Sequence, residues 1–116
     1  DELAKGQDFV YIHVEAPDEC GHRHEIENKV KSLELIDEKI LGPVLNALEQ
    51  YDDYKVMILP DHPTPLDLMT HTNDPVPFMI YKKSTPAGGT YSEEGAKESG
   101  IFIENGPKIM EYFINL

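Results

Sequence analysis

Aspartate and histidine residues gather in two short stretches of this sequence, HVEAPDECGHRH at residues 13–24 and LPDHPTPLDLMTHT at residues 59–72. Carboxylate oxygens and imidazole nitrogens are ligands that zinc and manganese accept. Taken singly, each such residue fits an ordinary role in a loop, such as capping a turn. Together, an Asp-x-x-x-His pair, an Asp-His dipeptide and a further histidine predict a divalent-metal site. Its candidate ligands are Asp18, His22, Asp61, His62 and His71.

Other polar residues in the same stretches are candidates for a supporting role. Glu15 precedes the first stretch's aspartate, and Thr64 and Thr72 flank the later histidines. Such groups often hydrogen-bond metal ligands and fix their orientation, although threonine also caps turns. His13 lies within an apolar run and is expected to be a hydrogen-bonded core histidine. Cys20 is a lone thiol, which is usually packed and inert.

The elements that must position these residues follow from hydrophobic patterning. The run DFVYIHVEA at residues 8–16 predicts a strand that is buried on both faces. Residues 24–51 carry apolar side chains at steps of three and four, which predicts an amphipathic helix. Gly42 and Pro43 should break or kink it. Residues 55–60 and 76–81 predict two more strands, and residues 106–116 predict a closing helix.

The order of these elements predicts an α/β fold with a short parallel sheet and helices on its faces, because a long helix separates the first two strands. Ligands of open parallel sheets bind beyond the carboxyl ends of the strands. Asp18 and His22 follow the first strand, Asp61 and His62 follow the second, and His71 lies in the loop before the third. We therefore expect all of them to converge at one rim of the sheet.

Composition narrows the classes of function. A chain of 116 residues predicts a single domain, and nothing in it resembles a signal peptide or a membrane span. We therefore expect a cytoplasmic protein without a membrane partner. The formal net charge of −12 argues against a nucleic-acid partner, because phosphate backbones need clustered lysine and arginine. An anionic substrate would need added positive charge, which a metal ion can supply.

Three blocks of the sequence carry a family resemblance. HVEAPDECGH, PDHPTP and THTNDPVPF resemble the metal-binding blocks of the cofactor-independent (2,3-bisphosphoglycerate-independent) phosphoglycerate mutases, and SGIFIENGPKIMEYF resembles their C-terminal end. The likeness is greatest to the archaeal-type branch, which includes homoserine-kinase-like proteins and belongs to the alkaline phosphatase superfamily. The resemblance implies an alkaline-phosphatase-like three-layer sandwich. It also implies that residues 1–116 are the C-terminal part of the metal-binding domain of a larger enzyme.

The resemblance further implies two divalent metal ions, manganese or zinc. By matching the motifs, Asp18, His22 and His71 would hold one ion, and Asp61 and His62 the other. The family completes the second site with an N-terminal aspartate and a serine nucleophile, neither of which this chain contains. The implied reaction interconverts 3-phosphoglycerate and 2-phosphoglycerate by metal-assisted phosphoryl transfer through that serine. The chain alone is therefore expected to be inactive, with the remainder of its own polypeptide as its partner.

Two alternatives remain open at this stage. A phosphatase or sulfatase-like hydrolase of the same superfamily would share these ligands but release phosphate to water. A non-catalytic metal-binding fragment would also share them. A kinase-like activity is the weakest reading, because the sequence has no glycine-rich phosphate loop.

Overall fold

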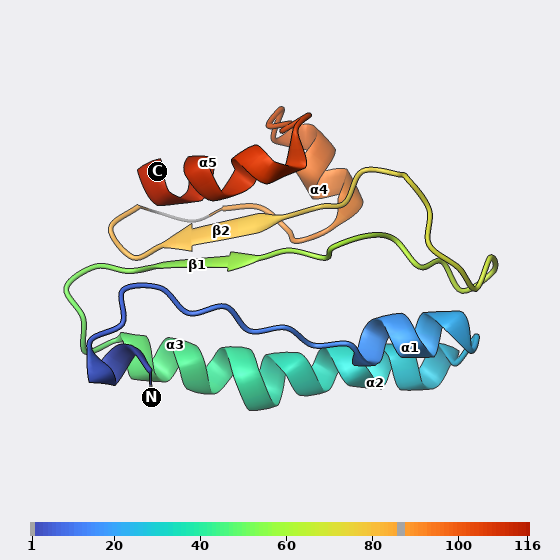
Figure 1. Cartoon of the computed structure of the whole chain (residues 1–116), viewed down its shortest axis with the longest axis horizontal. Coiled ribbons are helices and arrows are strands. Elements are labelled where there is room, and N and C mark those ends of the chain that lie inside the picture. Colours follow the sequence, from blue (N-terminus) through green and yellow to red (C-terminus); the bar gives the residue numbers. More distant parts are fainter. Residues whose placement is uncertain (1, 86–87) are drawn as a thin grey trace.

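The computed structural model describes residues 2–85 and 88–116, and the elements form layers of helix and strand (Figure 1). A long helical rod lies on one side, a pair of strands lies in the middle, and a shorter helix covers the other side. The elements are η1 (Leu3–Lys5), α1 (Ala16–His22), α2 (Ile26–Ile36), η2 (Asp37–Leu41), α3 (Gly42–Leu48), β1 (Lys55–Ile58), β2 (Met79–Lys82), α4 (Glu93–Glu98), η3 (Gly106–Lys108) and α5 (Ile109–Asn115).

The predicted long helix is present and continues through Gly42 and Pro43, so of the expected break or kink the break does not occur. Segments α2, η2 and α3 follow one another without a gap and form the rod of Figure 1. The turn before the proline is a π-helix, in which the Gly42 N–H bonds to the Asp37 carbonyl five residues back. A π turn shifts the hydrogen-bonding pattern by one residue, so Pro43 sits within the first turn of α3, where its missing N–H costs little.

The sheet differs from the predicted parallel arrangement. In the described part of the chain it consists of β1 and β2 alone, and they pair antiparallel, with Lys55 opposite Lys82 and Ile58 opposite Met79. The prediction of a parallel sheet relied on a helical connection between paired strands. The connection between β1 and β2 contains no helix, so the chain can reverse direction and pair antiparallel.

The first predicted strand is not part of the sheet, and its predicted burial is wrong. Residues 9–15 run as an irregular extended segment that passes between the helical rod and β1 (Figure 1). Tyr11 is 73% exposed and Ile12 55%, and the side chain of His13 is also exposed rather than in a core. An apolar β-branched run predicts a strand only where partner strands cover it, and no such cover exists among the described residues.

The buried apolar core is small. Among the described residues, only Cys20 and Leu48 are buried hydrophobic side chains. Burial of Cys20 agrees with the prediction of a packed, inert thiol. The closing helix is confirmed as η3 and α5, and Phe78 packs edge-on against Tyr112 of α5. None of the described helices is both long enough and apolar enough to cross a membrane.

Candidate metal centre

Helix α1 supplies the first two candidate ligands. Pro17 lies in its first turn, where a proline is favoured, and Asp18 and His22 follow one helical turn apart. Residues four apart lie on the same face of a helix. His22 Nε2 is accordingly 3.4 Å from Asp18 Oδ2.

The segment that leaves β1 supplies the remaining histidines. It runs along α1, so that His71 Nε2 lies 3.1 Å from Asp18 Oδ1 and 3.0 Å from His22 Nε2. The His62 ring lies against that of His71, with centroids 3.5 Å apart and the planes tilted by 31°, and His62 Nδ1 is 3.9 Å from Asp18 Oδ1. Three histidine rings therefore surround one carboxylate, between α1 and the segment that follows β1, rather than at the predicted rim of a parallel sheet.

A backbone carbonyl fixes the orientation of one of these rings. His22 Nδ1 lies 3.0 Å from the carbonyl oxygen of Met69, which can only accept a hydrogen bond. In the neutral imidazole, Nδ1 therefore carries the proton and the lone pair is on Nε2, the atom that faces Asp18 and His71. Met69 has φ 53°, a left-handed conformation that is uncommon for a residue with a long side chain. Metal-binding histidines commonly donate their second nitrogen to a carbonyl in this way.

Thr64 joins the segment after β1 to the carboxylate. Its side chain is buried, and its hydroxyl donates to Asp18 Oδ1 at 2.6 Å. This hydrogen bond is the largest influence on the pKa of Asp18 and lowers it; partial burial opposes the shift, and the nearby imidazoles of His22, His71 and His62 reinforce it. The carboxylate is thereby held in the charged form that a cation requires.

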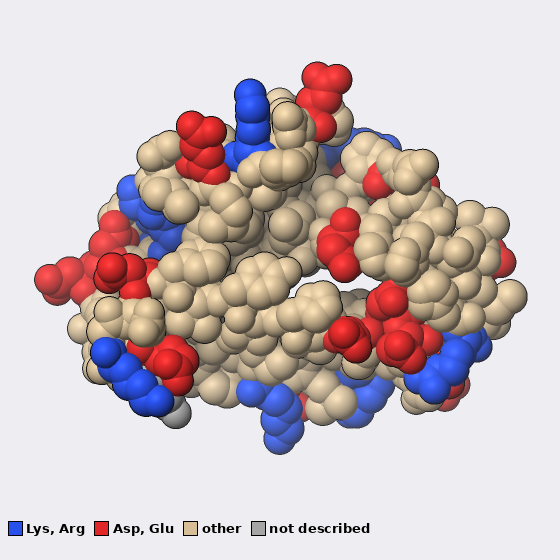
Figure 2. Space-filling view, viewed as in Figure 1, with Lys and Arg blue, Asp and Glu red and all other residues tan. Residues whose placement is uncertain are grey.

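Asp61 stands somewhat apart from the other candidates. Its carboxylate pairs with its own neighbour, with Oδ2 3.3 Å from His62 Nε2 and Oδ1 accepting the His62 N–H. It also lines a small cavity of about 280 Å³ together with His13, Val14, Glu15, Asp18 and Glu19. Acidic side chains border a hollow on this side of the molecule in Figure 2. The predicted division into an Asp18 group and an Asp61–His62 group is thus less sharp than expected, because His62 faces both aspartates.

The supporting candidates separate into one that reaches a ligand and two that bond elsewhere. Thr64 contacts Asp18 directly, as expected of a supporting residue. The Thr72 hydroxyl donates to the side chain of Asp74 and reaches none of the candidate ligands. Glu15 is largely exposed, and its carboxylate lies 3.8 Å from His13 Nε2.

Three contacts that hold the segment after β1 were not visible in the sequence. Lys29 donates to the Thr64 carbonyl at 2.6 Å, and His24 Nδ1 lies 2.5 Å from the Leu66 carbonyl. The third is the Met69 carbonyl on His22. Sequence patterning assigned no role to Lys29 or His24. Each of these contacts ends on a backbone carbonyl oxygen. Every residue has such an oxygen, so the sequence does not show which one will accept the bond.

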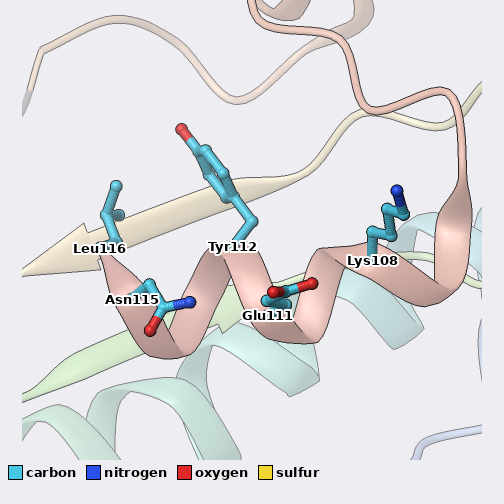
Figure 3. A pocket seen from close by; sticks show the side chains of 5 residues that line it. All are labelled: Lys108, Glu111, Tyr112, Asn115 and Leu116. Carbon is cyan, nitrogen blue, oxygen red and sulfur yellow. The ribbon is translucent and has the colours of Figure 1, made fainter.

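A second depression lies on α5, away from the histidine cluster. It is open and shallow, with a volume of about 380 Å³, and Lys108, Glu111, Tyr112, Asn115 and Leu116 line it. These side chains line one face of α5 and the end of η3, where they lie side by side rather than around a common point (Figure 3). Such an arrangement offers no convergent set of ligands, so the histidine cluster is the better candidate site.

The donor set of the cluster fits a divalent cation. One ligand atom from each of Asp18, His62 and His71 lies within 4.8 Å of the others. His22 adds an imidazole nitrogen, Nε2, which lies 3.4 Å from Asp18 Oδ2 and 3.0 Å from His71 Nε2. One carboxylate with several imidazoles is a mixed oxygen and nitrogen set that suits zinc or manganese rather than calcium.

Comparison with known proteins gives the chain relatives. The model of a family described as the metalloenzyme superfamily matches residues 1–115. The chain is 40% identical over 98% of its length to a protein of Geobacter sulfurreducens named probable 2,3-bisphosphoglycerate-independent phosphoglycerate mutase. It is 43% identical over 85% of its length to a mutase of the same name from Methanosarcina acetivorans, and 39% identical over 88% to one from Saccharolobus solfataricus.

The matched region is a small part of each relative. The chain spans 29% of the Geobacter protein, 26% of the Methanosarcina protein and 25% of the Saccharolobus protein. The comparison with solved structures found no match.

Proposed function

The chain belongs to the metalloenzyme superfamily, and from that membership we propose that it forms the divalent-metal centre of a 2,3-bisphosphoglycerate-independent phosphoglycerate mutase. The observation that carries this proposal is the convergence of His22, His62 and His71 on the carboxylate of Asp18. A convergence of this kind places unshared electron pairs around one point, and a cation is the group that such an arrangement stabilises.

The proposed assignment uses two ions. Asp18, His22 and His71 hold the first, and Asp61 and His62 contribute to the second. The contacts of His22 with both Asp18 and His71 support the first set, and the Asp61–His62 pair supports the second. When bound, manganese or zinc neutralises charge on phosphate oxygens and favours the deprotonated form of a hydroxyl nucleophile.

The residues of the chain prepare the centre for these ions. The Met69 carbonyl keeps His22 Nδ1 protonated, so that Nε2 has its lone pair free. The Thr64 hydroxyl stabilises the charged Asp18 carboxylate. The acidic cavity beside Asp61 attracts cations, whereas it repels an unaccompanied phosphoester. Substrate binding by this surface therefore depends on the ions, in agreement with the charge of the chain.

We place the serine that receives the phosphoryl group in polypeptide outside residues 1–116. The exposed apolar segment at residues 9–14 supports this arrangement, because it is suited to pair with strands of the same domain. The complete domain would then be the three-layer sandwich, with a parallel part that the two described strands do not form. The substrate proposed for the whole protein is phosphoglycerate.

The test is an enolase-coupled assay of the full-length protein with 3-phosphoglycerate. We expect turnover with Mn²⁺, its loss after chelation, and its recovery when Mn²⁺ is restored. Asp18→Asn and His62→Ala should lower turnover by orders of magnitude and leave the circular dichroism spectrum unchanged, while Asp37→Asn, an exposed aspartate of η2 outside the cluster and its cavity, serves as the control. Phosphate release without mutase turnover would contradict the proposal and identify a hydrolase instead.

A further inference from the structure

We propose that Gly21, Thr64 and Lys29 act together as a positioning device for the Asp18 carboxylate, which fixes it for the metal ion. This inference rests on the metal centre proposed above. The three residues come from α1, from the segment after β1, and from α2. None of them is assigned as a ligand, so each acts through the ligands beside it, above all Asp18.

The hydroxyl of Thr64 is the part that touches the ligand. It lies 2.6 Å from Asp18 Oδ1 and 3.3 Å from His62 Nδ1, between the aspartate of one helix and a histidine of the segment after β1. The Thr64 side chain is 6% exposed, so water competes poorly for Asp18 at this point. One oxygen of the carboxylate is therefore fixed in direction before any ion binds.

Gly21 sets how closely the Thr64 backbone approaches α1. A Cβ atom at residue 21 would lie 2.7 Å from the Thr64 carbonyl oxygen and 2.8 Å from its Cγ2 atom. Both distances are too short for a real side chain, and glycine within a helix otherwise costs about 1 kcal/mol relative to alanine. The glycine thus permits the contact that brings the Thr64 hydroxyl within reach of Asp18.

Lys29 of α2 holds the backbone of Thr64. Its Nζ donates to the Thr64 carbonyl oxygen at 2.6 Å in a partly buried contact. A Cβ at residue 21 would also lie 3.1 Å from this Nζ, so the ammonium fills the space beside the glycine. The Thr64 backbone is consequently held against α1 and α2 together, while its side chain points at Asp18.

The test is the affinity of the full-length protein for Mn²⁺, measured by electron paramagnetic resonance of the free ion. Removing a group that orients a metal ligand typically lowers metal affinity about 10–100-fold. We expect a loss in that range for Thr64→Val, which removes the hydroxyl at constant shape. Thr64→Ser keeps the hydroxyl and should bind Mn²⁺ nearly as tightly as the unchanged protein.

Gly21→Ala should lower the affinity to a similar extent, because the added methyl group displaces Thr64. The matched control is Gly95→Ala in α4, where a Cβ would also meet a threonine backbone oxygen, that of Thr90. This control should lower the melting temperature without changing Mn²⁺ affinity. The double variant of Gly21→Ala with Thr64→Val should bind no more weakly than the worse single variant, because both act through one hydrogen bond.

The outcomes separate this inference from the metal centre itself. Unchanged affinity in both Thr64→Val and Gly21→Ala, in a protein whose Mn²⁺ binding is lost with Asp18→Asn, overturns the positioning role alone. Mn²⁺ binding that is absent, or insensitive to Asp18→Asn, overturns the metal centre and this role together. Should Thr64→Val fail to fold, Lys29→Met gives the decision: a weaker affinity supports the device and an unchanged affinity overturns it.

Discussion

Lysines of the sheet fasten the end of the last helix: Lys82 donates to the Leu116 carbonyl oxygen, and Lys55 makes two further bonds whose removal gives a quantitative test of the fold. Lys55 of β1 donates through Nζ to the carbonyl oxygens of Phe113 and Ile114, at 3.0 and 2.7 Å. These are carbonyls of the last turn of α5, which have no partners within the helix. Lys55→Met keeps the aliphatic part of the side chain and removes only the ammonium group.

The expected cost follows from these contacts. A hydrogen bond to a charged group contributes about 1.5–3 kcal/mol, and a cation at a helix C-terminus about 0.3–1 kcal/mol. Because one of the two bonds is solvent-exposed and screened, we expect a net loss of about 1–2 kcal/mol in the free energy of local opening of α5. A loss of 1.4 kcal/mol corresponds to roughly tenfold faster amide exchange through that opening.

The assay is amide hydrogen exchange, followed by mass spectrometry on the peptide that contains residues 109–116. Lys108→Met is the matched control, because Lys108 lies at the opposite end of the same helix, where a positive charge opposes the helix dipole. It should leave the exchange of α5 unchanged or slow it slightly. Equal exchange rates in Lys55→Met and the unchanged protein would refute the account of how α5 is held.

Three further predictions concern residues at the end of α3 and just before β1. Desolvation raises the pKa of Asp53, but hydrogen bonds from Ser84 and Tyr54, helped by Lys82, outweigh it and lower that pKa. The resulting contribution to stability should be full above the unfolded value of about 3.9 and disappear as pH falls through the folded pKa. Asp53→Asn should remove this one contribution, so thermal melts at different pH values should show a smaller loss of stability in acid than in the unchanged protein. Desolvation and the hydrogen bond to Glu49 raise the pKa of Tyr54 to about 12, and an ultraviolet titration compared with Tyr54→Phe should find one phenol at that value. Leu48 is 6% exposed, so Leu48→Ala should cost about 2–4 kcal/mol in urea unfolding, and an unchanged midpoint would mean that this core does not contribute to stability.

The sequence predicted which side chains lie together better than it predicted the sheet, and the reasons are physical. Asp18 and His22 share a helical face through their spacing alone, which is a local property. His62 and His71 reach Asp18 because the segment that follows β1 runs along α1. Residue types and spacing therefore identified the side chains that gather, while the closeness of His62 to the Asp18 group depends on tertiary packing.

The direction of the sheet depended on which strands pair, and patterning does not specify partners. The apolar run that contains Tyr11 and Ile12 has strand composition but no partner among the described residues, so β1 pairs with β2 instead. Likewise, Pro43 predicts a break only if the helix keeps the regular α-helical hydrogen-bonding pattern. A π turn precedes Pro43 and changes that pattern, so the helix continues. The role of Gly21 could not be predicted from the sequence. The Thr64 carbonyl that approaches it is distant in the sequence, and this approach does not affect which residues neighbour Gly21 in the chain.

The most direct test of the metal centre is a crystal structure of the full-length protein grown with Mn²⁺, with anomalous scattering measured at the manganese edge. The account predicts an anomalous peak bound by Asp18, His22 and His71, with the Thr64 hydroxyl still on Asp18 and the Met69 carbonyl still on His22. A peak bound elsewhere, with Asp18 hydrogen-bonded to His71 and no ion between them, would contradict it.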